Sequence, residues 1–155
     1  MRLKIIAVGR LKSGPERELV EIYRARLKSA PAQLGPLDIV EIDERKDAAK
    51  VATTLKDVAS ALAPASQLIA MDERGETLST KRLAERLATW RDAGAAEAAF
   101  LIGGADGLPE EVRRQAQAVL SFGPLTWPHR LARAMLAEQL YRAASFLTGH
   151  PYHRE

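Results

Sequence analysis

Short apolar runs of strand length alternate along this chain with longer stretches in which apolar residues recur every three or four positions. This alternation predicts an α/β fold, a mostly parallel sheet with helices on both faces. No linker or internal repeat interrupts it, so residues 1–155 are predicted to form a single domain. The predicted strands are 3–8, 37–42, 67–71, 98–102 and a short one within 120–127. The predicted helices begin at about Pro15, Asp47, Ser79 or Thr80, Pro109 and His129, and end at about 27, 62, 94, 119 and 147.

Three loops of such a sheet are candidates for ligand binding. Open α/β sheets bind ligands at the edge where parallel strands end, and the loops after Met71, Ile102 and residues 120–122 follow such ends. In "FLIGGADG" (100–107), Gly103 and Gly104 allow a ligand to contact the main chain. The loop is acidic and has neither the Walker nor the dinucleotide-binding pattern. It suits a neutral or cationic ligand, although a tight turn explains its glycines equally well.

The composition excludes several kinds of chemistry. The chain has no cysteine, which rules out disulfides, thiolate metal sites and a thiol nucleophile. His150 and His153 lack a clear third ligand, so no metal is predicted. Because there is no signal-peptide pattern and no apolar stretch of membrane-spanning length, we expect a soluble cytoplasmic protein.

The charge distribution gives a weaker indication of a polyanionic partner. Lys and Arg total 23 against 20 Asp and Glu, a net charge of only +3. The basic excess lies in residues 128–155, which carry four arginines and all three histidines. A mildly basic surface without a partner remains an alternative explanation.

The segment before the last predicted helix has an irregular backbone. Gly123, Pro124 and Pro128 cannot complete a sheet ladder, and backbone groups freed in this way can bind the polar edge of an adenine beside the apolar Leu125 and Trp127. The apolar stripe of the last helix is explained by core packing or by a homodimer seam. In the tail, Tyr152 can stack on a base, unless the tail is simply disordered.

Six stretches together resemble one family. "AVGRLK", "MDERG", "FLIGGADG", "LTWPH", "EQLYRA" and "PYHRE" stand in the order and near the spacing of the RlmH family of ribosomal RNA methyltransferases, within the SPOUT superfamily. The resemblance implies a SPOUT-type domain with a C-terminal trefoil knot and an obligate homodimer. It also implies methyl transfer from S-adenosylmethionine to N3 of a pseudouridine in 23S ribosomal RNA of the assembled ribosome.

The chemistry of methyl transfer to N3 suggests roles for individual residues. Proton transfer is expected from His129 and His153, and stacking or orientation of the base from Tyr152. Arg133, Arg142 and Arg154 are expected to bind RNA phosphate or to stabilise the negative charge that develops on the base, with Arg142 assigned to catalysis and the other two to RNA binding. The tail of one subunit is expected to complete the site of the other. The residues implied to line the cofactor site are Met71, Gly103, Gly104, Phe122, Gly123, Pro124, Leu125, Thr126 and Trp127.

Three alternative functions remain at this point. The first is a related knotted methyltransferase that acts on transfer RNA or on another base. The second is a non-enzymatic, ribosome-associated RNA-binding module of the same fold. A flavodoxin-like nucleotide-binding domain is the third, and it is disfavoured because no loop suits a phosphate.

Overall fold

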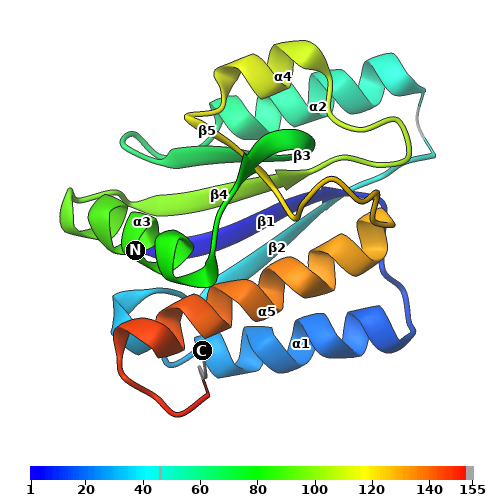
Figure 1. The fold of residues 1–155 in the computed structure, drawn as a ribbon. Helices are drawn as coiled ribbons and strands as arrows, with labels where there is room; N and C mark the ends of the chain where they lie inside the picture. Colours follow the sequence, from blue (N-terminus) through cyan, green and yellow to red (C-terminus); the bar gives the residue numbers. More distant parts are fainter. Residues whose placement is uncertain (46, 153–155) are drawn as a thin grey trace.

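A computed structural model describes residues 1–45 and 47–152, and in it a five-stranded sheet is covered by helices on both faces (Figure 1). The strands are β1 (Arg2–Val8), β2 (Leu37–Ile42), β3 (Gln67–Thr77), β4 (Glu97–Ile102) and β5 (Ala118–Ser121). The helices are α1 (Pro15–Leu27), α2 (Ala48–Ser60), α3 (Thr80–Asp92), α4 (Glu110–Gln115) and α5 (His129–Leu147), with a 3-10 turn, η1 (Pro31–Gln33).

The sheet has the strand order β2-β1-β4-β3-β5, and all of its pairs are parallel. The predicted parallel sheet is thus confirmed. β4 lies in the middle and is buried along its whole length, as a strand covered on both faces requires. Successive residues of β1 point to opposite faces, so that Ile5 packs in one core and Ile6 in the other. On one face lie α1, α3 and α5, and on the other lie α2 and α4 (Figure 1).

Local sequence signals account for the helix starts. The Ser79 side chain accepts a hydrogen bond from the Arg82 N–H at 3.3 Å, and the Asp47 side chain accepts one from the Lys50 N–H at 2.9 Å. Both residues are therefore N-caps, as predicted. The last helix begins at His129, directly after Pro128, and ends at Leu147, also as predicted.

Two predicted boundaries are wrong. β3 does not end at Met71 but continues to Thr77, and its pairing with β5 shifts so that Leu120 faces both Met71 and Glu76. The extension was missed because its residues are charged; they pair with β5 alone and stay largely exposed. The helix predicted as far as residue 119 ends at Gln115, because residues 118–121 join the sheet as β5.

Candidate functional site

A pocket of about 670 Å³ lies at the edge of the sheet where β3, β4 and β5 bring their loops together. This volume is within the range of small-molecule sites, roughly 300–1,000 Å³. Eight residues expected to bind a cofactor line it, while Pro124 is not among the lining residues. The eight are Met71, Gly103, Gly104, Phe122, Gly123, Leu125, Thr126 and Trp127.

The glycine loop after β4 closes on itself. The Gly107 N–H donates to the Gly104 carbonyl at 3.0 Å, and a Cβ added at Gly103 would overlap the main chain of Gly107. Gly107 itself has a φ of +72°, a conformation that favours glycine. The loop is therefore a tight turn and a pocket wall at once, so the two interpretations of its glycines are not exclusive.

The loop after β5 is held by a serine that the sequence analysis passed over. The Ser121 hydroxyl accepts from the Gly123 N–H at 3.0 Å and donates to the Gly123 carbonyl at 2.9 Å. A serine two residues before a glycine is a local turn signal that could have been recognised. The loop leaves Leu125 68% and Trp127 39% exposed at the margin of the pocket. Both side chains thus offer apolar surface to a ligand in the pocket.

Fixed negative charge forms a second wall of the pocket. The carboxylate of Asp72 accepts hydrogen bonds from Arg74 Nε at 2.9 Å and from Arg113 of α4 at 3.0 Å. The hydrogen bond from Arg74 holds the pKa of Asp72 well below its usual range. Asp106 and Glu73 line the same pocket. Arg74, which lines the same pocket, and Arg113 offset the charge of Asp72, so the negative charge offered to a ligand comes from Asp106 and Glu73.

His129 lies at the start of α5 and lines this pocket. Its Nε2 is 3.7 Å from Glu44 Oε2 and has no hydrogen-bond partner among the described residues. A Cβ at Gly9 would lie 2.8 Å from Glu44 Oε2 and 3.3 Å from His129 Nε2, so glycine at position 9 leaves room for the pair. The structure therefore places an imidazole and a carboxylate together at the pocket.

Arg133 contradicts the expectation that it meets RNA phosphate. Its side chain is only 1% exposed and forms an ion pair with Glu41 at 2.7 Å, while also donating to the Gly9 carbonyl at 2.9 Å. It joins α5 to the ends of β1 and β2. Its position on the same helix stripe as the buried Leu136 and Leu140 was the signal for burial.

Arg142 and Tyr152 lie far from the pocket of their own chain. Thirteen residues separate Arg142 from His129 on α5, which is about 20 Å at the helical rise. The Tyr152 hydroxyl lies 3.1 Å from that of Tyr23 and 3.2 Å from Glu138 Oε1. Burial, followed by these two neighbours, raises the pKa of Tyr152. The predicted residues His153 and Arg154 lie outside the described residues.

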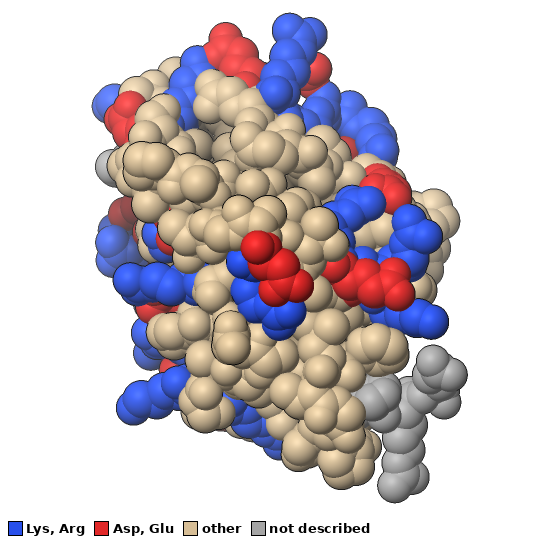
Figure 2. Space-filling view, turned by 90° about the vertical axis from the view of Figure 1, so that its left-hand side faces the viewer, with Lys and Arg blue, Asp and Glu red and all other residues tan. Residues whose placement is uncertain are grey.

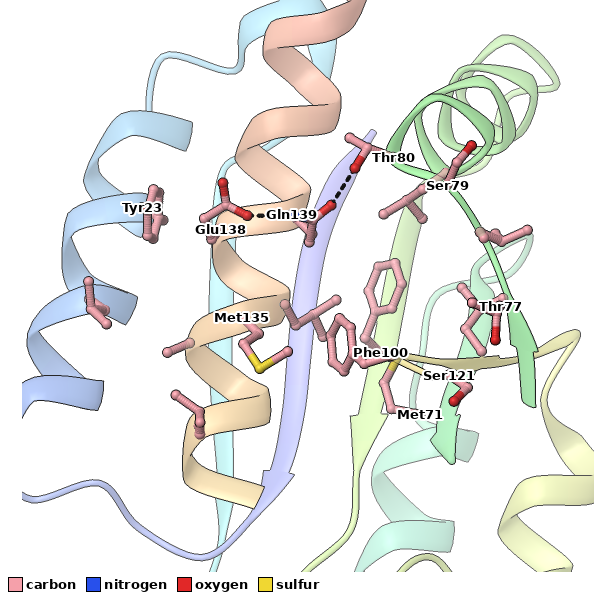
Figure 3. A pocket seen from close by; sticks show the side chains of 18 residues that line it. Tyr23, Met71, Thr77, Ser79, Thr80, Phe100, Ser121, Met135, Glu138 and Gln139 are labelled. Carbon is pink, nitrogen blue, oxygen red and sulfur yellow. Dashed lines mark hydrogen bonds between the residues drawn. The ribbon is translucent and has the colours of Figure 1, made fainter. Parts of the chain in front are cut away.

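A second hollow, of about 400 Å³, lies between α1, α3 and α5 (Figure 3). Figure 3 shows Tyr23, Met135 and Glu138 on one side of it and Ser79 and Thr80 on the other. It shares Met71, Leu120, Ser121 and Phe122 with the first pocket.

Leu19 and Ile22 of α1 lie on the same side of the sheet as this hollow and are 40% and 45% exposed. Together with Met135 they give the α1–α5 layer an apolar outer surface, which is typical of a surface that binds another protein chain.

The end of the molecule where β1 begins has a different character. Figure 2 shows uncharged areas above and below a group of acidic and basic side chains near the middle, with Lys and Arg along the margins and acidic side chains next to basic ones at several places. This mixture of signs does not distinguish that end as the side facing a polyanion.

No group of three or more His, Cys, Asp or Glu residues within 1–45 and 47–152 is arranged to hold a metal ion. In that same part of the chain, no helix has the length and apolar character needed to cross a membrane.

Comparison with known proteins agrees with this geometry. Residues 1–153 match the family described as "Predicted SPOUT methyltransferase". The chain is 50% identical to proteins named ribosomal RNA large subunit methyltransferase H from Rhodospirillum centenum and Dinoroseobacter shibae, over 99% of both chains in each case. A crystal structure of a probable methyltransferase from Bordetella pertussis Tohama I has a similar fold, with a TM-score of 0.56 at 16% identity over 92% of this chain and 96% of that one. The chain therefore belongs to the SPOUT methyltransferases and, within them, to the family of ribosomal RNA large subunit methyltransferase H.

Proposed function

We propose that this protein transfers a methyl group from S-adenosylmethionine to N3 of a pseudouridine in 23S ribosomal RNA, acting in the cytoplasm on the assembled ribosome. The observation that carries the proposal is the pocket formed by residues 71–74, 102–108, 120–123 and 125–129. Its walls combine apolar side chains, an accessible glycine backbone and fixed carboxylates. The name shared by relatives that are 50% identical supports the large-subunit RNA as substrate.

The pocket suits the methyl donor. Met71, Phe122 and Trp127 offer apolar surface to a purine ring, and the loop backbones offer the polar groups that its edge requires. Glu73 and Asp106 provide negative charge for a cationic ligand. When bound there, S-adenosylmethionine supplies an electrophilic methyl group on a positively charged sulfur.

The residues of the chain must remove one proton and hold the base in place. N3 of the base carries an imide proton and becomes a good nucleophile only when that proton leaves. The imidazole of His129 takes this proton, and Glu44, 3.7 Å from Nε2, stabilises the imidazolium that results. Holding the reacting groups together lowers the activation free energy by several kcal/mol.

Arg142 and Tyr152 come from a second subunit. Leu131, Met135, Glu138 and Arg142 form a half-buried stripe on α5, and its first three members line the hollow between α1, α3 and α5. Met135 lies midway between His129 and Arg142. Two α5 helices that pack antiparallel around Met135 bring His129 of one subunit beside Arg142 of the partner subunit. There Arg142 stabilises the negative charge that develops on the base, and Tyr152 stacks on it. His153 acts in proton transfer, and Arg154 binds phosphate.

We also propose that the chain forms a knot. Leu120 pairs with both Met71 and Glu76, so residues 72–75 bend around it. A Cβ at Gly75 would lie 2.6 Å from the carbonyl carbon of Leu120, which shows how closely the two segments pass. An experimental chain trace in which residues 118–147 do not thread the loop that contains β3 contradicts the knot.

Transfer of tritiated methyl groups tests the function. Assembled ribosomes, free ribosomal RNA, ribosomes that lack pseudouridine and transfer RNA are each incubated with the protein and labelled donor. We expect label only in the first, located at N3 of one pseudouridine. Label in ribosomes without pseudouridine, or in transfer RNA alone, contradicts the proposed substrate. Donor binding without any transfer contradicts the enzymatic function.

A further inference from the structure

All three tyrosines of this chain lie around one arginine. The guanidinium carbon of Arg26 is 5.3 Å from the ring centroid of Tyr23, 5.4 Å from that of Tyr141 and 5.5 Å from that of Tyr152. Each distance is within the range of about 6 Å for a cation–π contact. The rings of Tyr141 and Tyr152 meet edge to face at 4.8 Å. One cation therefore contacts α1, α5 and the C-terminal segment together.

No ion pair accounts for the position of Arg26. Its side chain is on an exposed residue in the last turn of α1, and it pairs with no carboxylate of the described residues. Arg142, which also lies over the Tyr152 ring at 5.0 Å, is bound to Glu138 at 2.6 Å. A positive charge at the end of a helix is favourable by itself, but that role requires no aromatic neighbours. The contacts with the three tyrosine rings are thus what distinguishes the position of Arg26.

The C-terminal segment folds back so that the Tyr152 ring reaches Arg26. Helix α5 ends at Leu147, and Gly149, with a φ of +66°, turns the chain back. Tyr152 then returns to the α1–α5 surface, where Arg26 and Arg142 both contact its ring.

We propose that Arg26 is a positioning residue that gathers the three tyrosine rings and so fixes the path of the C-terminal segment toward the RNA. It touches neither the pocket nor the reacting atoms, and it acts through Tyr152. The effect on turnover rests on the proposed function, whereas the effect on the rings does not.

The rings are tested by NMR of protein labelled with carbon-13 in tyrosine, which gives one set of ring signals for each of the three residues. We expect Arg26→Met to shift all three sets and Arg26→Lys to restore them in part, since lysine keeps the cation. Lys28→Met, two residues further along, is the matched loss of charge and leaves the signals in place. If the tyrosine ring signals of the Arg26→Met variant coincide with those of the unmodified protein, the proposal is overturned.

The path of the segment is tested by turnover. Arg26→Met should lower kcat for ribosome methylation by about fivefold, the size of an exposed cation–π contact, with the Kd of S-adenosylmethionine unchanged. In a Tyr152→Ala background the same substitution should cause no further loss, because coupled residues are not additive. An equal loss in that background shows that Arg26 acts without Tyr152 and overturns the proposal. If the unmodified protein transfers no methyl group, the proposed function fails, and the NMR spectra still decide whether Arg26 positions the rings.

Discussion

Arg133 and Glu41 form an ion pair at 2.7 Å across 92 residues of sequence, with the arginine side chain almost fully buried. The same Glu41 oxygen accepts the Leu11 N–H at 2.6 Å. Arg133 stands four residues after His129, and it thereby joins α5 to the ends of β1 and β2. The ion pair sets where the first turn of α5 stands, and with it one wall of the pocket.

Loss of Arg133 should therefore reduce stability strongly. We expect Arg133→Met to lower the free energy of unfolding by about 2 kcal/mol, because the Gly9 carbonyl and Glu41, whose side chain is 31% exposed, each lose a charged hydrogen-bond donor. Urea denaturation measures this change. Arg114→Met, which removes an exposed i,i+4 partner of Glu110, is the control and should cost less than about 1 kcal/mol. Equal losses for the two variants contradict the role given to the buried arginine.

The cap of α3 gives a smaller and more local effect. Ser79→Ala should lower the free energy of unfolding by about 1 kcal/mol, since the Arg82 N–H loses its acceptor. Ser79→Asn keeps a side-chain acceptor and should restore most of the loss. Thermal unfolding of the three proteins compares them. If the asparagine variant is no better than the alanine variant, the side-chain hydrogen bond is not what stabilises the helix.

Low pH should weaken the contribution of Asp72 to the stability of the folded protein. Its pKa is lowered in the folded protein, chiefly by the hydrogen bond from Arg74, so its stabilisation is present above the unfolded pKa of about 4 and is lost as the pH falls below it. Asp72→Asn should thus destabilise the protein at pH 7, and the difference from the unmodified protein should shrink below about pH 4. Urea denaturation at a series of pH values measures it. If the difference in free energy of unfolding between the two proteins does not change with pH, then Asp72 is not an ionised carboxylate held by its hydrogen bonds.

The glycine loop offers a comparison of two neighbours. A Cβ at Gly103 meets the main chain of Gly107, which cannot move without opening the turn, whereas a Cβ at Gly104 meets only a side-chain methyl of Val8, at 3.1 Å. Titration calorimetry should show that Gly103→Ala weakens S-adenosylmethionine binding by tenfold or more, about 1.4 kcal/mol, and that Gly104→Ala weakens it less. The reverse order contradicts the assignment of this turn to the cofactor wall.

The proposed twofold axis near Met135 can be located by cross-linking. The chain has no cysteine, so Met135→Cys introduces a single thiol. Because disulfides form only when the Cα atoms approach within about 7 Å, oxidation should link two subunits if the axis passes there. Thr53→Cys, on α2 at the other face of the sheet, is the control and should stay unlinked. A dimer in solution that Met135→Cys fails to link places the axis elsewhere.

The sequence was informative where local chemistry decides the structure. The caps at Asp47 and Ser79 and the start of α5 after Pro128 depend on neighbouring residues alone, and all were predicted correctly. The extension of β3 depends on pairing with a strand more than forty residues away, which periodicity does not report. The burial of Arg133 likewise depends on Glu41, a distant partner. The meeting of three loops at one edge followed from the expectation of parallel strands, whereas the individual cofactor residues came from the family resemblance. The separation of Arg142 from His129 follows from the predicted length of α5, which was not applied to these two residues.

The central claim is that each site is built from the pocket of one subunit and Arg142 and Tyr152 of the partner subunit. Co-expression of His129→Ala with Arg142→Ala tests it most directly, with ribosome methylation as the measurement and each variant inactive by itself. In a mixed dimer, one site then has both residues intact. The account predicts about a quarter of the unmodified rate, because half of randomly paired dimers are mixed and each holds one intact site. No recovery in dimers shown to be mixed would contradict it.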